Sequence, residues 1–216
     1  MGLLDGLRQV LGIHAEADAT RNADPEDLFG MSTAYITMEA ELGYEPVSEA
    51  ALCFSEVDNT DFREAVEEVH EILEVGGEET GTEAEGHTDE YGYSWIVLRD
   101  DNFEDLVTSL NFASDTLMER GYGSRLLAAL FPFRDASSKH RRGGGGSADR
   151  DGQYAYWIYS FRRGSYYPFV PTGTSDRDSG AEFKLESNLD GELDVENDKE
   201  YWYPLWPDAP GRHPWE

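Results

Sequence analysis

The sequence is poor in cysteine, in lysine and in long apolar runs, and each shortage excludes a class of protein. Cys53 is the only cysteine, so no disulfide can form within the chain. It lies in the apolar run AALCFSEV, where we expect it to be buried and structural. No run of about 18 apolar residues is present, and the first residues lack the basic start and cleavage site of a signal peptide. The predicted location is therefore the cytoplasm.

Positive charge is scarce as well. Asp and Glu number 45 against 17 Lys and Arg, which gives a formal charge of −28, and lysine occurs only at positions 139, 184 and 199. This composition is similar to that of proteins from salt-in halophilic archaea, in which surface carboxylates keep proteins dissolved in molar salt; an ordinary acidic protein is the alternative. The paired arginines at 141–142 and 162–163 stand next to glycine, so no basic patch indicates nucleic-acid binding.

Patterns typical of catalytic and metal sites are missing too. The five histidines lie in different segments without ligand spacing, and no HExxH, P-loop, GxGxxG or GxSxG motif occurs. Carboxylate pairs such as Asp100 with Asp101, or Glu182 with Glu186, could act as acid and base, but a chain so rich in acids forms such pairs by chance. We therefore predict no catalytic, cofactor or metal site.

Apolar periodicity and the positions of glycine and proline predict the secondary structure. A helix capped by Asp24 should close at Gly43, a second should stop at Gly76, and a third should end at Gly121. The predicted helices cover about 24–43, 59–77, 102–120 and 179–193, and the predicted strands cover 49–57, 82–88, 91–98, 125–133 and a hairpin over 154–169.

This order of elements predicts an α+β fold, an antiparallel sheet with packed helices. We expect one domain over 24–216, with a flexible glycine-rich insertion at 135–152 that a hairpin can absorb at little entropic cost. The tail EYWYPLWPDAPGRHPWE is rich in Trp and Pro, and we predict that it forms an extended strap over the domain.

The chain begins with MGLLDGLRQVLG, which is apolar on one side if it is helical. At about 100° per residue, an arc of roughly 120° holds Leu3, Leu4, Leu7, Val10 and Leu11. Twelve helical residues span about 18 Å, too short for a bilayer of about 30 Å. This stripe could pack on the protein's own core, on a partner helix or on lipid, and the polar tether at 12–23 would let it dock at a distance.

Aromatic residues are dense in the predicted hairpin, where alternation places them on both faces of the sheet. One face can be core, and the other is either covered by the tail or open to a partner. In the third helix, Phe112 points away from the apolar face. The candidate partner- or membrane-binding residues are therefore Leu3, Leu4, Leu7, Val10, Leu11, Phe112, Tyr154, Tyr156, Tyr166 and Tyr167.

Several blocks carry a resemblance to a known family. EDLFGMSTAYITME, DLVTSLNFASDTLMERGYGSRLLAALFPF, YWIYSFRRGSYYPF and EYWYPLWP, together with the first twelve residues, are similar to PspA-associated proteins of the PspAB type found in haloarchaea. The resemblance omits only the glycine-rich insertion, and it implies association with the phage-shock-protein envelope-stress response, whose central component PspA is a helical membrane-surface protein. By element order alone, the fold also resembles YbjN and type III secretion chaperones.

We therefore predict a non-enzymatic adaptor or regulatory protein of membrane stress. It would contact a PspA-like or other membrane-stress protein, with peripheral contact at the inner membrane face as an open alternative and no nucleic acid as partner. The alternative function is an enzyme that uses carboxylates in a cleft of the sheet. A ligand-sized cavity lined by converging polar groups would favour the enzyme, whereas a filled core beneath an open aromatic or helical surface would favour the adaptor.

Overall fold

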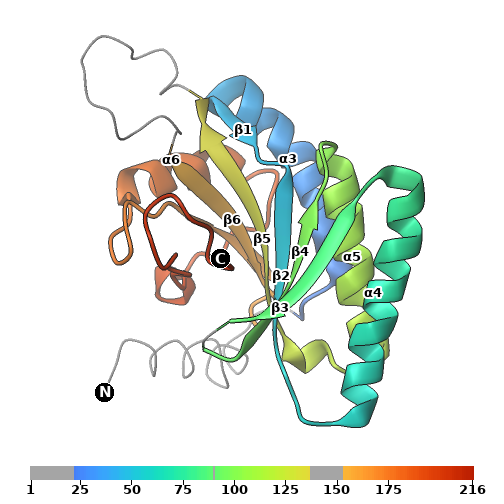
Figure 1. Ribbon diagram of the computed structural model, residues 1–216. Coiled ribbons are helices and arrows are strands. Elements are labelled where there is room, and N and C mark those ends of the chain that lie inside the picture. The colour runs from blue at the N-terminus through green and yellow to red at the C-terminus, as the bar shows by residue number, and fades with distance from the viewer. Residues whose placement is uncertain (1–21, 90, 137–152) are drawn as a thin grey trace.

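A seven-stranded antiparallel sheet forms the centre of the computed structural model, which describes residues 22–89, 91–136 and 153–216 (Figure 1). The strands follow the order β3-β4-β2-β5-β6-β7, and β1 pairs with the end of β5. Their bounds are β1 Tyr44–Pro46, β2 Glu49–Ser55, β3 Glu83–Thr88, β4 Tyr93–Arg99, β5 Leu126–Asp135, β6 Tyr154–Ser160 and β7 Ser165–Phe169.

The described residues also form four α-helices, which confirms the α+β prediction. They are α3 Met31–Thr37, α4 Thr60–Thr80, α5 Phe103–Glu119 and α6 Ser179–Leu189. The first predicted helix is divided into three parts, because a 3-10 turn (η1, Pro25–Gly30) precedes α3 and a π-helical turn (η2, Met38–Leu42) follows it. Further short 3-10 turns are η3 Gly123–Arg125 and η5 Lys199–Tyr201.

The helix starts follow the sequence closely. Asp24, Asn59 and Asn102 each accept a hydrogen bond from a backbone N–H of the first turn that follows. The end of α4 is different from the prediction, since the helix continues beyond Gly76 and ends at Gly81, whose φ is +94°. A glycine inside a helix costs only about 1 kcal/mol relative to alanine, which tertiary packing can outweigh.

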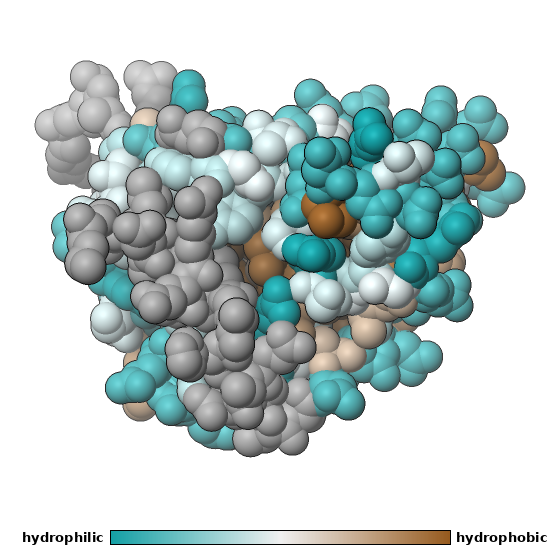
Figure 2. Space-filling model, turned by 90° about the horizontal axis from the view of Figure 1, so that it is seen from below, coloured by the Kyte–Doolittle hydropathy of each residue, from teal (hydrophilic) through white to brown (hydrophobic). Residues whose placement is uncertain are grey.

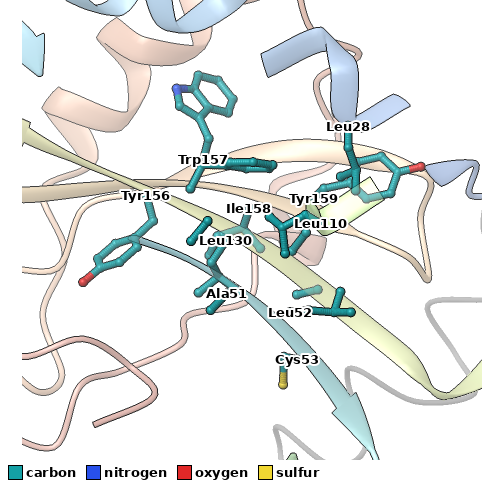
Figure 3. Packing of buried hydrophobic residues seen from close by; sticks show 14 of the residues in the cluster. Leu28, Ala51, Leu52, Cys53, Leu110, Leu130, Tyr156, Trp157, Ile158 and Tyr159 are labelled. Carbon is teal, nitrogen blue, oxygen red and sulfur yellow. The ribbon is translucent and has the colours of Figure 1, made fainter. Parts of the chain in front are cut away.

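One face of the sheet is covered by η1, α3, α4 and α5, and its core is apolar. Phe131 and Trp157 are direct cross-strand partners, so both point to this side. The ring of Phe103 in α5 lies 6.0 Å from that of Phe131, and Trp157 Nε1 donates to Met38 Sδ at 3.4 Å. Figure 3 shows Trp157 and its neighbour Tyr156 pointing to opposite sides of the strand, as alternation requires.

The opposite face is covered by the C-terminal tail, which is drawn in red in Figure 1. The Tyr167 hydroxyl donates to the Tyr203 carbonyl at 3.0 Å, and the rings of Phe169 and Trp206 lie 5.1 Å apart. After η5 the tail has no regular secondary structure, yet Trp202, Tyr203, Leu205 and Trp215 are buried. The predicted strap over the domain is therefore confirmed.

The buried apolar side chains on the two faces belong to one continuous cluster. The predicted amphipathic helix and most of its tether lie outside the described residues, and so does most of the glycine-rich insertion, which falls on 137–152. The division into a segment over 1–23 and a domain over 24–216 therefore stays a prediction.

Candidate functional site

The predicted partner-binding residues are divided between the core and the surface. Tyr156, Tyr166 and Tyr167 are buried, Tyr154 is half-buried, and 53% of Phe112 is exposed. The five apolar residues of the opening stripe, Leu3, Leu4, Leu7, Val10 and Leu11, lie outside the described residues. Only Phe112 among the described candidates presents a largely free apolar surface.

The tail decides between the two alternatives for the aromatic hairpin. Tyr156 forms a hydrogen bond with His213 Nδ1 at 3.0 Å, and its ring lies edge-on to Trp215. Tyr166 points to the helix-covered face, where its hydroxyl donates to the Asp27 carbonyl at 3.1 Å. The face is therefore covered rather than open, and a partner would reach Tyr156 only after displacing the tail.

Burial also determines the chemistry of these hydroxyls. It raises the pKa of Tyr156, of Tyr166 and of Tyr167 above the usual tyrosine value. The three groups therefore stay protonated at neutral pH and act as hydrogen-bond donors or acceptors within the core.

A polar depression of about 810 Å³ opens at one end of the sheet, between the ends of β2, β4 and β5 and the tail. Its charged lining includes Glu49, Arg99, Arg134, His213 and Glu216. This is the location at which the enzyme hypothesis expects carboxylates to gather.

Glu49, Arg99 and Arg134 in this depression have partners within the protein. Arg99 Nε donates to Glu49 Oε1 at 3.0 Å, and its NH1 group donates to Glu85 Oε2 at the same distance. Both hydrogen bonds raise the pKa of Arg99, and the one with Glu85 has the larger effect. The Arg134 guanidinium donates a hydrogen bond to the Tyr154 hydroxyl, and its central carbon lies 4.6 Å from the centre of the Tyr154 ring.

His213 is a titratable group in the lining of the depression. Its ring is stacked on Trp215, and its Nε2 lies 3.8 Å from Glu49 Oε2, which is too long for a hydrogen bond. Burial lowers the pKa of His213, although Glu49 and Glu216 act in the opposite direction. A neutral imidazole is therefore favoured at neutral pH, and it could exchange a proton with a ligand.

The described residues hold little else that such chemistry needs. They contain no group of three or more side chains able to ligate a metal ion. Cys53 is buried, and burial raises the pKa of its thiol well above the usual value, so the nucleophilic thiolate is disfavoured. The predicted structural role of Cys53 is consistent with this environment.

The helical layer carries exposed apolar side chains that the sequence analysis missed. On α4, 39% of Ile72 and 68% of Val75 are exposed. A helical wheel places Ile72 at the edge of the buried stripe and Val75 outside it, so the exposure of Val75 could be predicted from the sequence. The remaining exposed large apolar residues are Phe29, Ile36, Tyr91, Phe112 and Phe183.

Figure 2 shows one face of the molecule, on which teal predominates and brown is confined to a few small areas. Within the part of the chain that the structure describes, no helix is both long and apolar enough to cross a bilayer.

In a comparison with protein-family models, residues 1–215 match PspAB, described as PspA associated protein B. The chain belongs to the PspAB family. The sequence blocks that suggested this resemblance are thus confirmed as a guide to the family. No curated protein and no solved structure shows significant similarity to the chain.

The extent of the PspAB match bears on the candidate residues. It begins at residue 1, so the opening apolar stripe lies inside the region shared with the family, as do Phe112 and the aromatic hairpin. The family description states an association with PspA and names no reaction.

Proposed function

We propose that this member of the PspAB family is a non-enzymatic adaptor or regulator of the PspA-linked membrane-stress response, acting through protein–protein contact. The family match over residues 1–215 is the observation that carries the proposal. The structure supports contact as the mode of action, because Val75 and Phe112 are exposed on the helices while the aromatic face is filled by the tail.

Protein contact is a better explanation than lipid contact for the helical surface. The outer side of α4 carries many Asp and Glu residues, which anionic lipid head groups would repel. Peripheral membrane contact would then depend on the opening stripe, whose single Arg8 offers little attraction to such lipids.

The experiment is a binding measurement between the purified full chain and purified PspA in molar KCl. We expect a saturable complex, and we expect deletion of residues 1–12, or Leu4→Glu with Leu7→Glu, to abolish it. The melting temperature of these variants should match that of the full chain. Absence of a complex with the full chain would show that the proposed function is wrong.

The enzyme alternative is supported by one observation, the position of His213 beside Glu49 in the depression of about 810 Å³. In that case a small molecule should raise the melting temperature of the full chain, and Glu49→Gln should remove the effect. A ligand whose effect survives Glu49→Gln would not use this depression as proposed.

A further inference from the structure

The helices α4 and α5 lie side by side and run in opposite directions (Figure 1). Two contacts fix this arrangement: the rings of Phe62 and Tyr122 have their centres 5.0 Å apart, and Glu68 forms an ion pair with Arg120. The start of α4 therefore meets the end of α5, and the outer sides of the two helices lie next to each other. We call the strip of surface between them the groove between α4 and α5.

Three exposed apolar residues lie at one level of this groove. At a rise of about 1.5 Å per residue, Val75 lies about 10 Å from Glu68 along α4, and Phe112 lies about 12 Å from Arg120 along α5. Since the helices are antiparallel and linked by the Glu68–Arg120 pair, Val75 and Phe112 lie at nearly the same position along the helix axes.

The side of α4 that faces the groove follows from the spacing of its residues. Glu68, Ile72 and Val75 are separated by four and three positions, so they share one side of the helix, the side from which Glu68 reaches α5. Packed helices have axes about 8–10 Å apart, which brings Ile72 and Val75 within reach of the same bound side chain as Phe112. Their exposed fractions are 39%, 68% and 53%.

The charge around these apolar residues is strongly negative. The only Lys or Arg in α4 is Arg63, whereas its acids are Asp61, Glu64, Glu67, Glu68, Glu71, Glu74, Glu78 and Glu79. On the α5 side, Asp115 and Glu119 are exposed. A second copy of the chain, with its own formal charge of −28, would bring like charge to this surface. Charge complementarity instead selects a basic partner.

We propose that the groove between α4 and α5 binds a basic amphipathic helix of a partner protein. The apolar stripe of that helix contacts Ile72, Val75 and Phe112, and its Lys and Arg side chains pair with the acids of α4. This inference rests on the proposed function, protein–protein contact, and adds the chemistry of the partner.

The first test uses two probes, purified PspA and a synthetic 18-residue helix with Leu on one face and Lys on the other. The variant is Val75→Gln with Phe112→Gln, which leaves the charge unchanged. We expect at least tenfold weaker binding of both probes. Phe183→Gln is the matched control, because Phe183 is 63% exposed on α6, a helix that packs against β7. This variant should bind both probes with an affinity within twofold of that of the unaltered chain.

The second test concerns charge. Glu71→Lys on α4 should weaken binding several-fold in 0.15 M KCl, and the difference should shrink in 2 M KCl, where screening is stronger. Glu200→Lys, on an exposed residue of the tail, is the control and should have no comparable effect. Each variant should melt within about 2 °C of the unaltered chain, because the altered side chains are exposed.

The outcomes separate this inference from the proposed function. If PspA binds the unaltered chain and the groove variant, Val75→Gln with Phe112→Gln, equally well, the groove proposal is wrong and the proposed function stands. If PspA fails to bind the unaltered chain, the proposed function is wrong. Binding of the synthetic helix to the unaltered chain and to the groove variant then tests the groove proposal by itself. The groove proposal would be wrong if Phe183→Gln weakened binding of the probes as much as the groove variant does. It would also be wrong if the synthetic helix bound only after deletion of residues 1–12.

Discussion

The two faces of the sheet are stabilised in different ways. The helix-covered face is held by apolar contacts such as Phe103 with Phe131, within elements whose periodicity is visible in the sequence. The tail-covered face depends on specific polar contacts, for example Tyr167 with Tyr203 and Tyr156 with His213. An irregular segment thus needs hydrogen bonds at chosen points, because it lacks an internal ladder that satisfies its own backbone.

A buried ion pair also holds the segment that leads into the tail. Arg163 Nε donates to Glu196 Oε2 at 2.7 Å, with side-chain exposures of 4% and 9%, and the Arg163 guanidinium carbon lies 3.8 Å from the centre of the Tyr201 ring. Burial by itself would raise the pKa of Glu196, but the hydrogen bonds from Arg163, Ser165 and the Asp198 N–H lower it below the usual value. The charged pair therefore joins the turn between β6 and β7 to the segment that leads into the tail.

Trp157→Ala should have the largest effect, because it removes the largest fully buried side chain of the helix-covered face. We expect a loss of about 3–5 kcal/mol in the free energy of unfolding, measured by urea denaturation. A loss below about 1 kcal/mol would show that this face is not closely packed.

Glu196→Gln should come next and tests the polar attachment of the tail. The glutamine keeps the shape but leaves the buried Arg163 without its charged partner, so we expect a loss of about 2–3 kcal/mol. The control is Glu186→Gln, which breaks the more exposed pair with Lys199 and should cost less than about 1 kcal/mol. Equal effects of the two changes would contradict the comparison between buried and exposed pairs.

A pH titration should reveal a smaller contribution from His213. Burial lowers its pKa in the folded protein, so the folded state binds this proton less readily than the unfolded chain does. Stability should therefore fall as the pH falls from 7.5 to 5.5, through the unfolded value of about 6.5. The slope of melting temperature against pH should be shallower in His213→Asn; an unchanged slope would assign the effect to other groups.

Trp215→Phe should have the smallest effect of the four changes. The buried Trp215 Nε1 has no hydrogen-bond partner among the described residues, so phenylalanine removes an unsatisfied donor along with some apolar surface. We expect a change within about 1 kcal/mol in either direction. Trp157→Phe, which removes a bonded indole N–H, should be the more destabilising of the two by thermal denaturation.

The comparison between faces also explains which elements could be predicted. The caps at Asp24, Asn59 and Asn102 act within one turn, so the starts of their helices were visible in the sequence. The end of α4 was not, because Gly77 allows a close approach to Thr82: a Cβ at Gly77 would lie 2.2 Å from the Thr82 carbonyl oxygen. Thr82 directly precedes β3, so this approach depends on how the chain turns from α4 into β3.

The same distinction applies to the candidate sites. Phe112 was identified because it departs from the apolar period of α5, which is a local property. Strand β1 was missed, since its three residues form a strand only by pairing with β5 about 90 residues later. Ile72 lies at the edge of the apolar stripe of α4, and periodicity alone does not fix how far such an edge residue is exposed.

The sequence by itself determined the α+β class, the positions of most elements and the family, because periodicity, capping and turn residues act over a few positions. Only the tertiary structure decided what covers the aromatic hairpin and where exposed apolar residues meet. Tyr156 and His213 are 57 positions apart, and Val75 and Phe112 lie on different helices. Contacts over such separations depend on the packing of whole elements, which no local pattern of residues encodes.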